Sequence, residues 1–151
     1  MKPLKILAAS LAAGALLALA APASVDNIRV VLKGHDPVAY FTEGKPTKGD
    51  PKHSYDFDDQ RYHFASAKHR AMFMADPDKY LPQFGGYCTG SMSRGVRNEG
   101  NPEAWVMVDG KLYVFGAKDP EAAAKARAAA LADPEGFKAK VANAQKNFTR
   151  N

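Results

Sequence analysis

Hydrophobic and polar residues alternate in two parts of the chain, and each part predicts a β-hairpin. Residues 55–57 and 62–64 alternate aromatic with polar side chains, and a short polar stretch of turn composition separates them. Residues 105–108 and 111–115 flank Asp109-Gly110, a dipeptide typical of two-residue hairpin turns. We expect the two hairpins to form one small antiparallel sheet.

Aspartate followed by proline predicts the start of three helices. The aspartate side chain can cap the first turn, and proline suits the first helical position. The three dipeptides are Asp76-Pro77, Asp119-Pro120 and Asp133-Pro134, and they predict helices over 77–80, 120–131 and 134–148. Ser66 predicts a cap for a further helix over 67–75. Hairpins with short helices packed on them, followed by C-terminal helices, make this an α+β fold.

The region before the first hairpin has a weaker pattern. The apolar run 28–32 suits a strand or a tether on the core, and residues 38–41 suit a short strand. Residues 42–53 are polar and contain two glycines and two prolines, so we expect a surface loop there.

The N-terminus has the pattern of a secretory signal peptide. Lys2 and Lys5 precede an apolar stretch rich in alanine and leucine, and small residues near position 20 suit a signal peptidase. We expect residues 1–23 to be the leader, with cleavage near 20–23, and residues 24–151 to form a single periplasmic domain. The apolar stretch is shorter than a membrane-spanning helix needs, so no stable membrane span is expected after cleavage.

The charge of the chain gives no support to a nucleic-acid partner. The formal net charge is +5, and removal of Lys2 and Lys5 with the leader would lower it. The remaining lysines and arginines are scattered rather than massed on one segment. We therefore expect no nucleic-acid partner, and a metal ion or a periplasmic protein remains as the partner.

Cys88 is the only cysteine of the 151 residues, so no disulfide can form within the chain. In an oxidising compartment a single thiol is exposed to oxidation unless it is buried, bound to a metal, joined to a partner or used in chemistry. Cys88 is therefore the first residue to consider for function.

A series of spaced motifs between Gly34 and Tyr113 resembles the YHS domain as it occurs in exported bacterial proteins. The motifs are His35-Asp36-Pro37-Val38-Ala39-Tyr40-Phe41, Tyr62-His63-Phe64-Ala65-Ser66, His69, Phe73, Pro77, Tyr80, Gly85-Gly86-Tyr87-Cys88 and Asp109-Gly110-Lys111-Leu112-Tyr113. The resemblance implies a YHS-like domain with a C-terminal helical extension. It also implies heavy-metal handling, which the family shows largely through relatives fused to metal-transporting ATPases.

This chain departs from those ATPase-linked relatives at several cysteine positions. Where they have cysteines, this chain has Ala39, Ala65 and His69. Exported relatives often have alanine where Thr89 follows the cysteine, and a different pair of residues after Tyr113. The relatives' metal site therefore does not transfer to this chain ligand by ligand.

The residues themselves predict a soft-metal site centred on Cys88 and His69. His69 and Phe73 lie four apart on the predicted helix, so if Phe73 faces the core His69 is partly buried too. His63 alternates with core aromatics on a strand and should lie nearer solvent, which makes it the second choice. Met92, His35 and Asp36 are further possible ligands. Thiolate with imidazole suits copper or zinc, and haem stays open as an alternative.

Two other functions compete with metal binding. Cys88 could be a buried small residue in a non-catalytic partner-binding module, with His69 as a hydrogen-bonded core histidine. Alternatively, Cys88 and a histidine could form a thiol enzyme, with the backbone near Gly85-Gly86 as an oxyanion donor. Common enzyme signatures such as Cys-x-x-Cys, His-Glu-x-x-His and a phosphate-binding glycine loop are absent from the sequence, so an enzyme is the less favoured reading.

Overall fold

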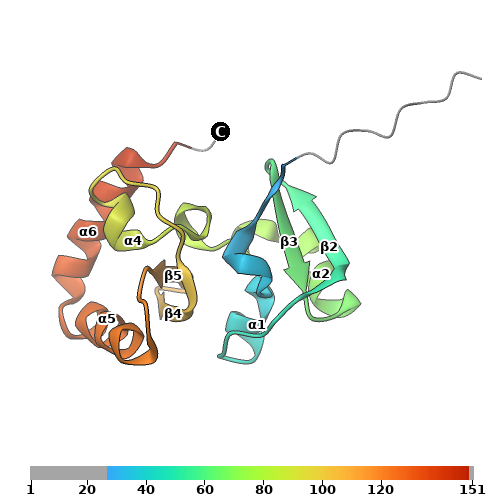
Figure 1. Cartoon of the computed structure of the whole chain (residues 1–151), viewed down its shortest axis with the longest axis horizontal. Helices are drawn as coiled ribbons and strands as arrows, with labels where there is room; N and C mark the ends of the chain where they lie inside the picture. The colour runs from blue at the N-terminus through green and yellow to red at the C-terminus, as the bar shows by residue number, and fades with distance from the viewer. Residues whose placement is uncertain (1–26, 150–151) are drawn as a thin grey trace, which may run out of the picture.

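The computed structural model describes residues 27–149 of the chain, which form an α+β fold (Figure 1). The strands are β1 (Arg29–Val30), β2 (Asp50–Phe57), β3 (Gln60–Phe64), β4 (Asn101–Val108) and β5 (Lys111–Phe115). The α-helices are α1 (Pro37–Thr42), α2 (Ala67–Ala75), α3 (Pro77–Tyr80), α4 (Thr89–Met92), α5 (Pro120–Ala132) and α6 (Pro134–Asn147). Two 3₁₀ segments complete the set, η1 (Val31–Gly34) and η2 (Gln83–Gly86).

Both predicted hairpins are present, but they belong to two separate sheets. In the first sheet β3 lies between β2, which is antiparallel to it, and the short β1, which is parallel to it. The second sheet consists of β4 and β5 alone. The expectation of one shared sheet was wrong, because the β4–β5 hairpin packs between two cores instead of extending the first sheet.

The helices that follow Asp-Pro dipeptides begin where the sequence predicts. The side chains of Asp76, Asp119 and Asp133 each accept a hydrogen bond from a backbone N–H of the first turn. A fourth helix of this kind, α1, replaces the strand expected at 38–41. Asp36 caps it, with Pro37 at its first position, so the rule that predicts the other three applies here as well.

Two smaller expectations also changed. The apolar run at 28–32 divides into the two-residue strand β1 and the 3₁₀ segment η1. The end of the expected 42–53 loop is part of a strand, because β2 begins at Asp50 and contains His53.

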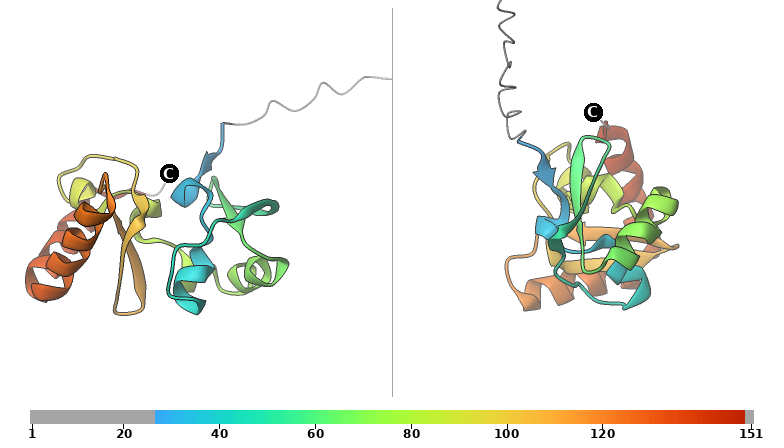
Figure 2. Two further views of the ribbon diagram at one scale, coloured as in Figure 1. Left: turned by 60° about the horizontal axis from the view of Figure 1, so that its bottom comes forward. Right: turned by 90° about the vertical axis from the view of Figure 1, so that its right-hand side faces the viewer.

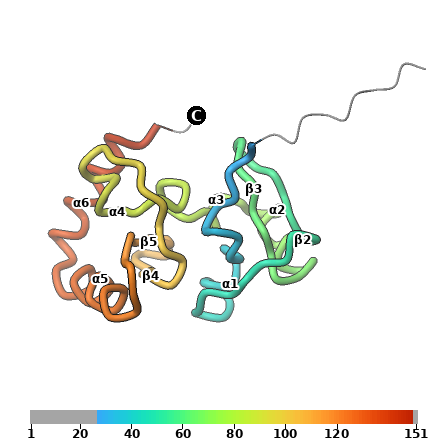
Figure 3. Tube along the Cα trace, viewed as in Figure 1, coloured from blue at the N-terminus to red at the C-terminus, as the bar shows by residue number. Residues whose placement is uncertain are grey.

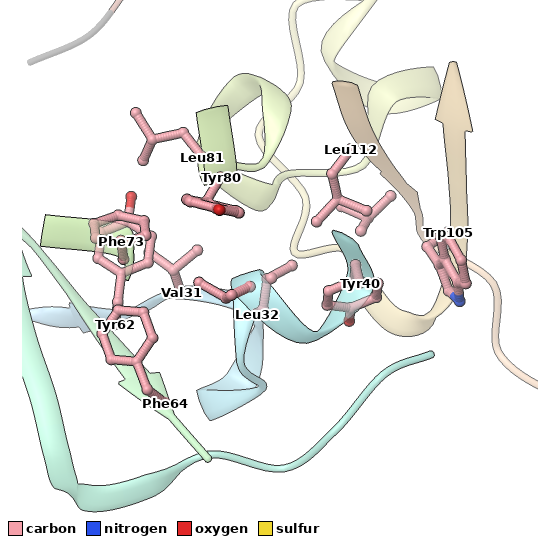
Figure 4. Close-up of a cluster of buried hydrophobic side chains, with 12 residues drawn as sticks. Val31, Leu32, Tyr40, Tyr62, Phe64, Phe73, Tyr80, Leu81, Trp105 and Leu112 are labelled. Atoms are coloured by element: carbon pink, nitrogen blue, oxygen red, sulfur yellow. The ribbon is translucent and has the colours of Figure 1, made fainter. Parts of the chain in front are cut away.

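The first hydrophobic core lies mainly in the N-terminal half of the chain, residues 27–81 (Figure 4). Phe73 of α2 is at its centre, with its ring 4.8 Å from that of Tyr62 and 5.2 Å from that of Phe64. This core also includes residues of the other half, namely Trp105, Leu112 and Val114. The chain passes from the first half to the second through the segment after α3 (Figure 3).

The second core lies between the β4–β5 hairpin and the two C-terminal helices, and the turned views show these helices beside the hairpin (Figure 2). Phe137 of α6 packs against Tyr113 and Phe115 of β5. Neighbouring residues of a strand point to opposite faces, so the hairpin gives one face to each core. This explains why β5 is buried along residues 112–115 rather than on alternate residues.

No helix within residues 27–149 is both long and apolar enough to cross a membrane. The expected leader, residues 1–23, lies outside the described residues.

Candidate functional site

Asp36 is fully buried, and its carboxylate joins three segments of the first half. Oδ1 accepts hydrogen bonds from the backbone N–H of Val38 at 2.8 Å and of Ala39 at 3.4 Å, which caps α1. Oδ2 accepts from the backbone N–H of Ala65 at 2.8 Å and from Nδ1 of His69 at 2.6 Å. A buried carboxylate requires such partners, and here they connect α1, the end of β3 and α2.

His69 is oriented by Asp36, and its side chain is only 12% exposed, as the helical spacing predicts. Ser66 caps α2 by accepting a hydrogen bond from the backbone N–H of His69 at 3.1 Å, which places the imidazole in the first turn beside Asp36. Nδ1 donates to the carboxylate, and the other ring nitrogen, Nε2, lies 4.0 Å from a Glu43 carboxylate oxygen. Metal-binding histidines are often held by a carboxylate in this way.

His35 and His63 both lie near Lys48, whose charge acts on each of them. Nδ1 of His35 is 3.0 Å from the carbonyl oxygen of Leu32, and Nε2 is 3.8 Å from a Glu103 carboxylate oxygen. Burial lowers the pKa of His35, and Lys48 lowers it further against opposing contributions from the hydrogen bond and Glu103.

His63 is half-buried on β3, between Tyr62 and Phe64, which are almost completely buried, as the alternation predicts. Burial lowers its pKa, and the positive charges of Arg61 and Lys48 add to the effect. Because His35 and His63 both have a lowered pKa, both favour the neutral imidazole, which is the form that binds metals.

Cys88 lies in the second half, where the chain runs beside β5 before α4. Cys88 forms an isolated parallel bridge with Val114, and its backbone N–H donates to the carbonyl oxygen of Asn98 at 2.8 Å. Its carbonyl oxygen accepts from Met92 at 2.9 Å in the single turn of α4. The residue is 8% exposed, so backbone contacts on both sides hold a nearly buried thiol in place.

Hydrogen-bond donors surround the sulfur of Cys88. Burial by itself would raise the pKa of this thiol, but the Ser91 hydroxyl and the backbone N–H groups of Ser91, Gly116 and Gly90 outweigh burial and lower it. Glycine allows the backbone to come close: a Cβ at Gly116 would lie 3.4 Å from Sγ, and one at Gly90 would lie 3.9 Å away. The site therefore stabilises a thiolate.

A hollow of about 600 Å³ lies next to this thiol, between β5 and the C-terminal helices. Its wall includes Gly90, two residues after Cys88, and Phe115, which follows the residue that bridges to Cys88, and four alanines of α5 form much of the rest. Thr89, the residue after Cys88, is fully buried, and its hydroxyl has no hydrogen-bond partner among residues 27–149.

The structure joins only part of the predicted ligand set. Asp36 and His69 are directly bonded, whereas no hydrogen bond or ion pair in the described part of the chain connects Cys88 with any histidine. The expected meeting of His69 with Cys88 was therefore wrong. The reason is that α2 packs on α1, β2 and β3, while the Cys88 segment packs on β5.

Met92 does not have the predicted position of a metal ligand either, because its side chain is fully buried in the second core with Phe84 and Phe137. Across residues 27–149, no group of three or more His, Cys, Asp or Glu side chains is arranged to hold a metal ion.

The donors around Cys88 were missed by the sequence reasoning. Ser91 and Gly90 follow the cysteine directly, and Thr-Gly-Ser after a cysteine could have indicated N–H and hydroxyl groups turned toward the sulfur. Gly116 lies 28 positions later and reaches Cys88 only because β5 runs beside it, so no local pattern indicates it.

Comparison with known proteins adds no relative: no family model, no curated protein and no solved structure matches the chain.

Proposed function

We propose that this protein is an exported member of the YHS family that binds Cu(I) through the thiolate of Cys88 and passes the ion to a periplasmic partner. The observation that carries the proposal is the set of donors around the sulfur, from Ser91, Gly90 and Gly116. The resemblance of the spaced motifs to the YHS domain supports a metal as the ligand.

The chemistry of Cys88 suits a soft ion. The thiolate, not the thiol, is the metal ligand, and a lowered pKa increases the thiolate fraction near neutral pH. Soft thiolate ligands favour Cu(I) over harder ions. Hydrogen bonds from N–H groups to the sulfur can remain while the sulfur binds a metal, as outer-shell contacts do at many metal sites.

The scarcity of nearby ligands favours transfer of the ion over storage. No group of three or more ligating side chains is present in the described part of the chain, so a metal on Cys88 would keep open coordination positions. The hollow beside Gly90 and Phe115 leaves space on that side for an approaching ligand. A partner's thiolate or thioether could then take over the ion without a closed site having to open.

Thiol chemistry without a metal is the second candidate, and the lowered pKa of Cys88 is the observation that favours it. A cysteine–histidine enzyme is less well supported, because no histidine bonds to Cys88 within residues 27–149. A partner-binding module would need only a buried cysteine and gives no reason for the donors around the sulfur.

The first experiment is a Cu(I) titration of the mature protein against a chromophoric chelator. We expect one ion per chain, with binding lost in Cys88→Ser and unchanged in His69→Ala and His53→Ala. Loss in His69→Ala as well would return His69 to the ligand set. Unchanged binding in Cys88→Ser would overturn the proposal.

A second measurement separates metal binding from a reactive thiol. The rate of alkylation of Cys88 should follow pH with an apparent pKa below the ordinary 9.0 of a cysteine thiol. Cu(I) should protect the thiol at every pH. A reactive thiol that Cu(I) does not protect would instead support metal-free thiol chemistry.

A further inference from the structure

A second cavity, of about 370 Å³, lies between the two halves of the molecule. It shares no lining residue with the hollow near Cys88. Its wall combines residues of β3, α3, η2, β5 and α6, so segments far apart in sequence meet there. Its volume falls within the roughly 300–1,000 Å³ of small-molecule sites, which often occupy such junctions.

All three glutamines of the chain line this one cavity. Gln60 comes from β3, Gln83 from η2 and Gln145 from α6. A glutamine amide offers two donor hydrogens and an acceptor oxygen, so three of them around one space can form several hydrogen bonds of both kinds.

Two of these amides have no hydrogen-bond partner in the described part of the chain. Within residues 27–149, the side chains of Gln83 and Gln145 make no hydrogen bond, and Gln145 is exposed on its helix. The Gln60 oxygen accepts from Tyr62 at 3.3 Å and from Arg29 at 3.5 Å, which leaves its NH₂ group for another acceptor. The amides are therefore available to a ligand.

The other lining residues favour a neutral ligand. Asp58 and Asp78 bring negative charge and Lys111 brings positive charge to the same wall, so neither an anion nor a cation meets a field of one sign. Phe84 and Phe148 contribute aromatic surface, with ring centroids 5.8 Å apart and planes at 74°. Hydroxyl groups match amides because both donate and accept, and the C–H face of a sugar ring packs against aromatic rings.

The wall is held in a defined shape. Phe84 has φ of 55°, which is unusual for a residue with a side chain, and Gly85 follows with φ of 61°. The Arg29 guanidinium donates to the carbonyl oxygen of Gly85 at 2.7 Å, and Pro82 forms an isolated bridge with Leu112. Backbone strain of this kind persists only where surrounding contacts maintain it, and it is often found at binding sites.

We propose that this glutamine-lined cavity binds a small neutral sugar of mono- or disaccharide size. The juxtaposition of three amides, two aromatic rings and charges of both signs carries the proposal. It is independent of the function proposed for Cys88, because the two sites share no lining residue.

The test uses ligand-observed saturation-transfer NMR on the folded protein, with glucose, N-acetylglucosamine and maltose as probes. We expect transfer to at least one of these sugars and a weakening of about tenfold in Gln145→Leu, the loss expected for one or two hydrogen bonds. Asn143→Leu is the matched control, because it also replaces an exposed amide on α6 but lies outside the cavity.

Several results would overturn the proposal. They are absence of transfer to every sugar, equal binding by Gln145→Leu and the parent protein, or equal weakening by Asn143→Leu. Binding of lysine or glutamate in place of the sugars would overturn it too, because it would make the site one for charged ligands. Gln83→Leu provides a second variant should Gln145→Leu lose its fold, which far-UV circular dichroism would show.

Discussion

At the scale of single residues, the buried carboxylate of Asp36 accepts hydrogen bonds from three separate segments of the chain. It caps α1, accepts from Ala65 at the end of β3, and orients His69 on α2, all from a position with no solvent contact. The aspartate of the His-Asp-Pro-Val motif is thus explained by folding alone. The burial of Asp36 and its hydrogen bonds are explained without a bound metal.

Replacement of Asp36 by alanine should destabilise the protein far more than loss of an ordinary helix cap. The change leaves buried N–H groups and the His69 imidazole without an acceptor, so we expect a loss of about 3–5 kcal/mol. Asp119→Ala, at the exposed N-terminus of α5, removes only a cap and should cost about 1 kcal/mol. Urea unfolding of both variants measures the difference, and equal losses would contradict a joining role for Asp36.

Removal of the Thr89 hydroxyl should have the opposite effect and stabilise the protein. Its hydroxyl is buried without a partner in the described part of the chain, which costs free energy that an aliphatic side chain of similar shape would not. Thr89→Val should therefore stabilise the fold by about 1–2 kcal/mol. Thr42→Val is the control, because the Thr42 hydroxyl donates to the Val38 carbonyl oxygen at 3.1 Å. Thermal unfolding should show a gain for the first variant only; a loss in Thr89→Val would mean that the hydroxyl has a partner it needs.

At the scale of elements, local chemistry predicted most of the fold. Helix starts at Asp76, Asp119 and Asp133 were found because capping is decided by neighbouring residues. The same chemistry was present at Asp36 and was overlooked, since the apolar residues after it resemble a strand. The burial of the His69 side chain and the half-buried position of His63 between two buried aromatic residues also followed from helix and strand periodicity.

The candidate site could be predicted less well, because its geometry depends on which elements pack together. Periodicity indicates which face of α2 is buried but not what it is buried against. His69 was expected to meet Cys88 and meets Asp36 instead. Gly116 reaches the sulfur through the isolated bridge between Cys88 and Val114, a contact that no local pattern in either segment encodes.

At the scale of the whole molecule, the β4–β5 hairpin connects the two cores. Leu112 and Val114 belong to the first core, and Tyr113 and Phe115 belong to the second. Trp105 of β4 touches both halves: its ring is 5.3 Å from that of Tyr40, and the Arg127 guanidinium of α5 lies 4.7 Å from its centre. Neither core can lose its packing without disturbing the hairpin that the other requires.

We therefore predict that the two cores unfold together in one cooperative transition. Trp105 is the only tryptophan and reports on the first core, whereas far-UV circular dichroism reports mainly on the long helices α5 and α6. The two signals should give the same midpoint in urea. Phe137→Ala in the second core should cost about 3–5 kcal/mol and lower both midpoints equally, as should Phe73→Ala in the first.

Separate midpoints would instead mean that each half folds on its own and that the hairpin joins them only loosely. Phe137→Ala would then lower the circular dichroism midpoint and leave the midpoint of the Trp105 fluorescence transition, which follows the first core, unchanged. That outcome would also bear on the glutamine-lined cavity, because Gln60 lies in one half and Gln145 in the other. A cavity formed by both halves exists only while both are folded, so a single cooperative transition would protect a ligand site at this junction against separate loss of either half.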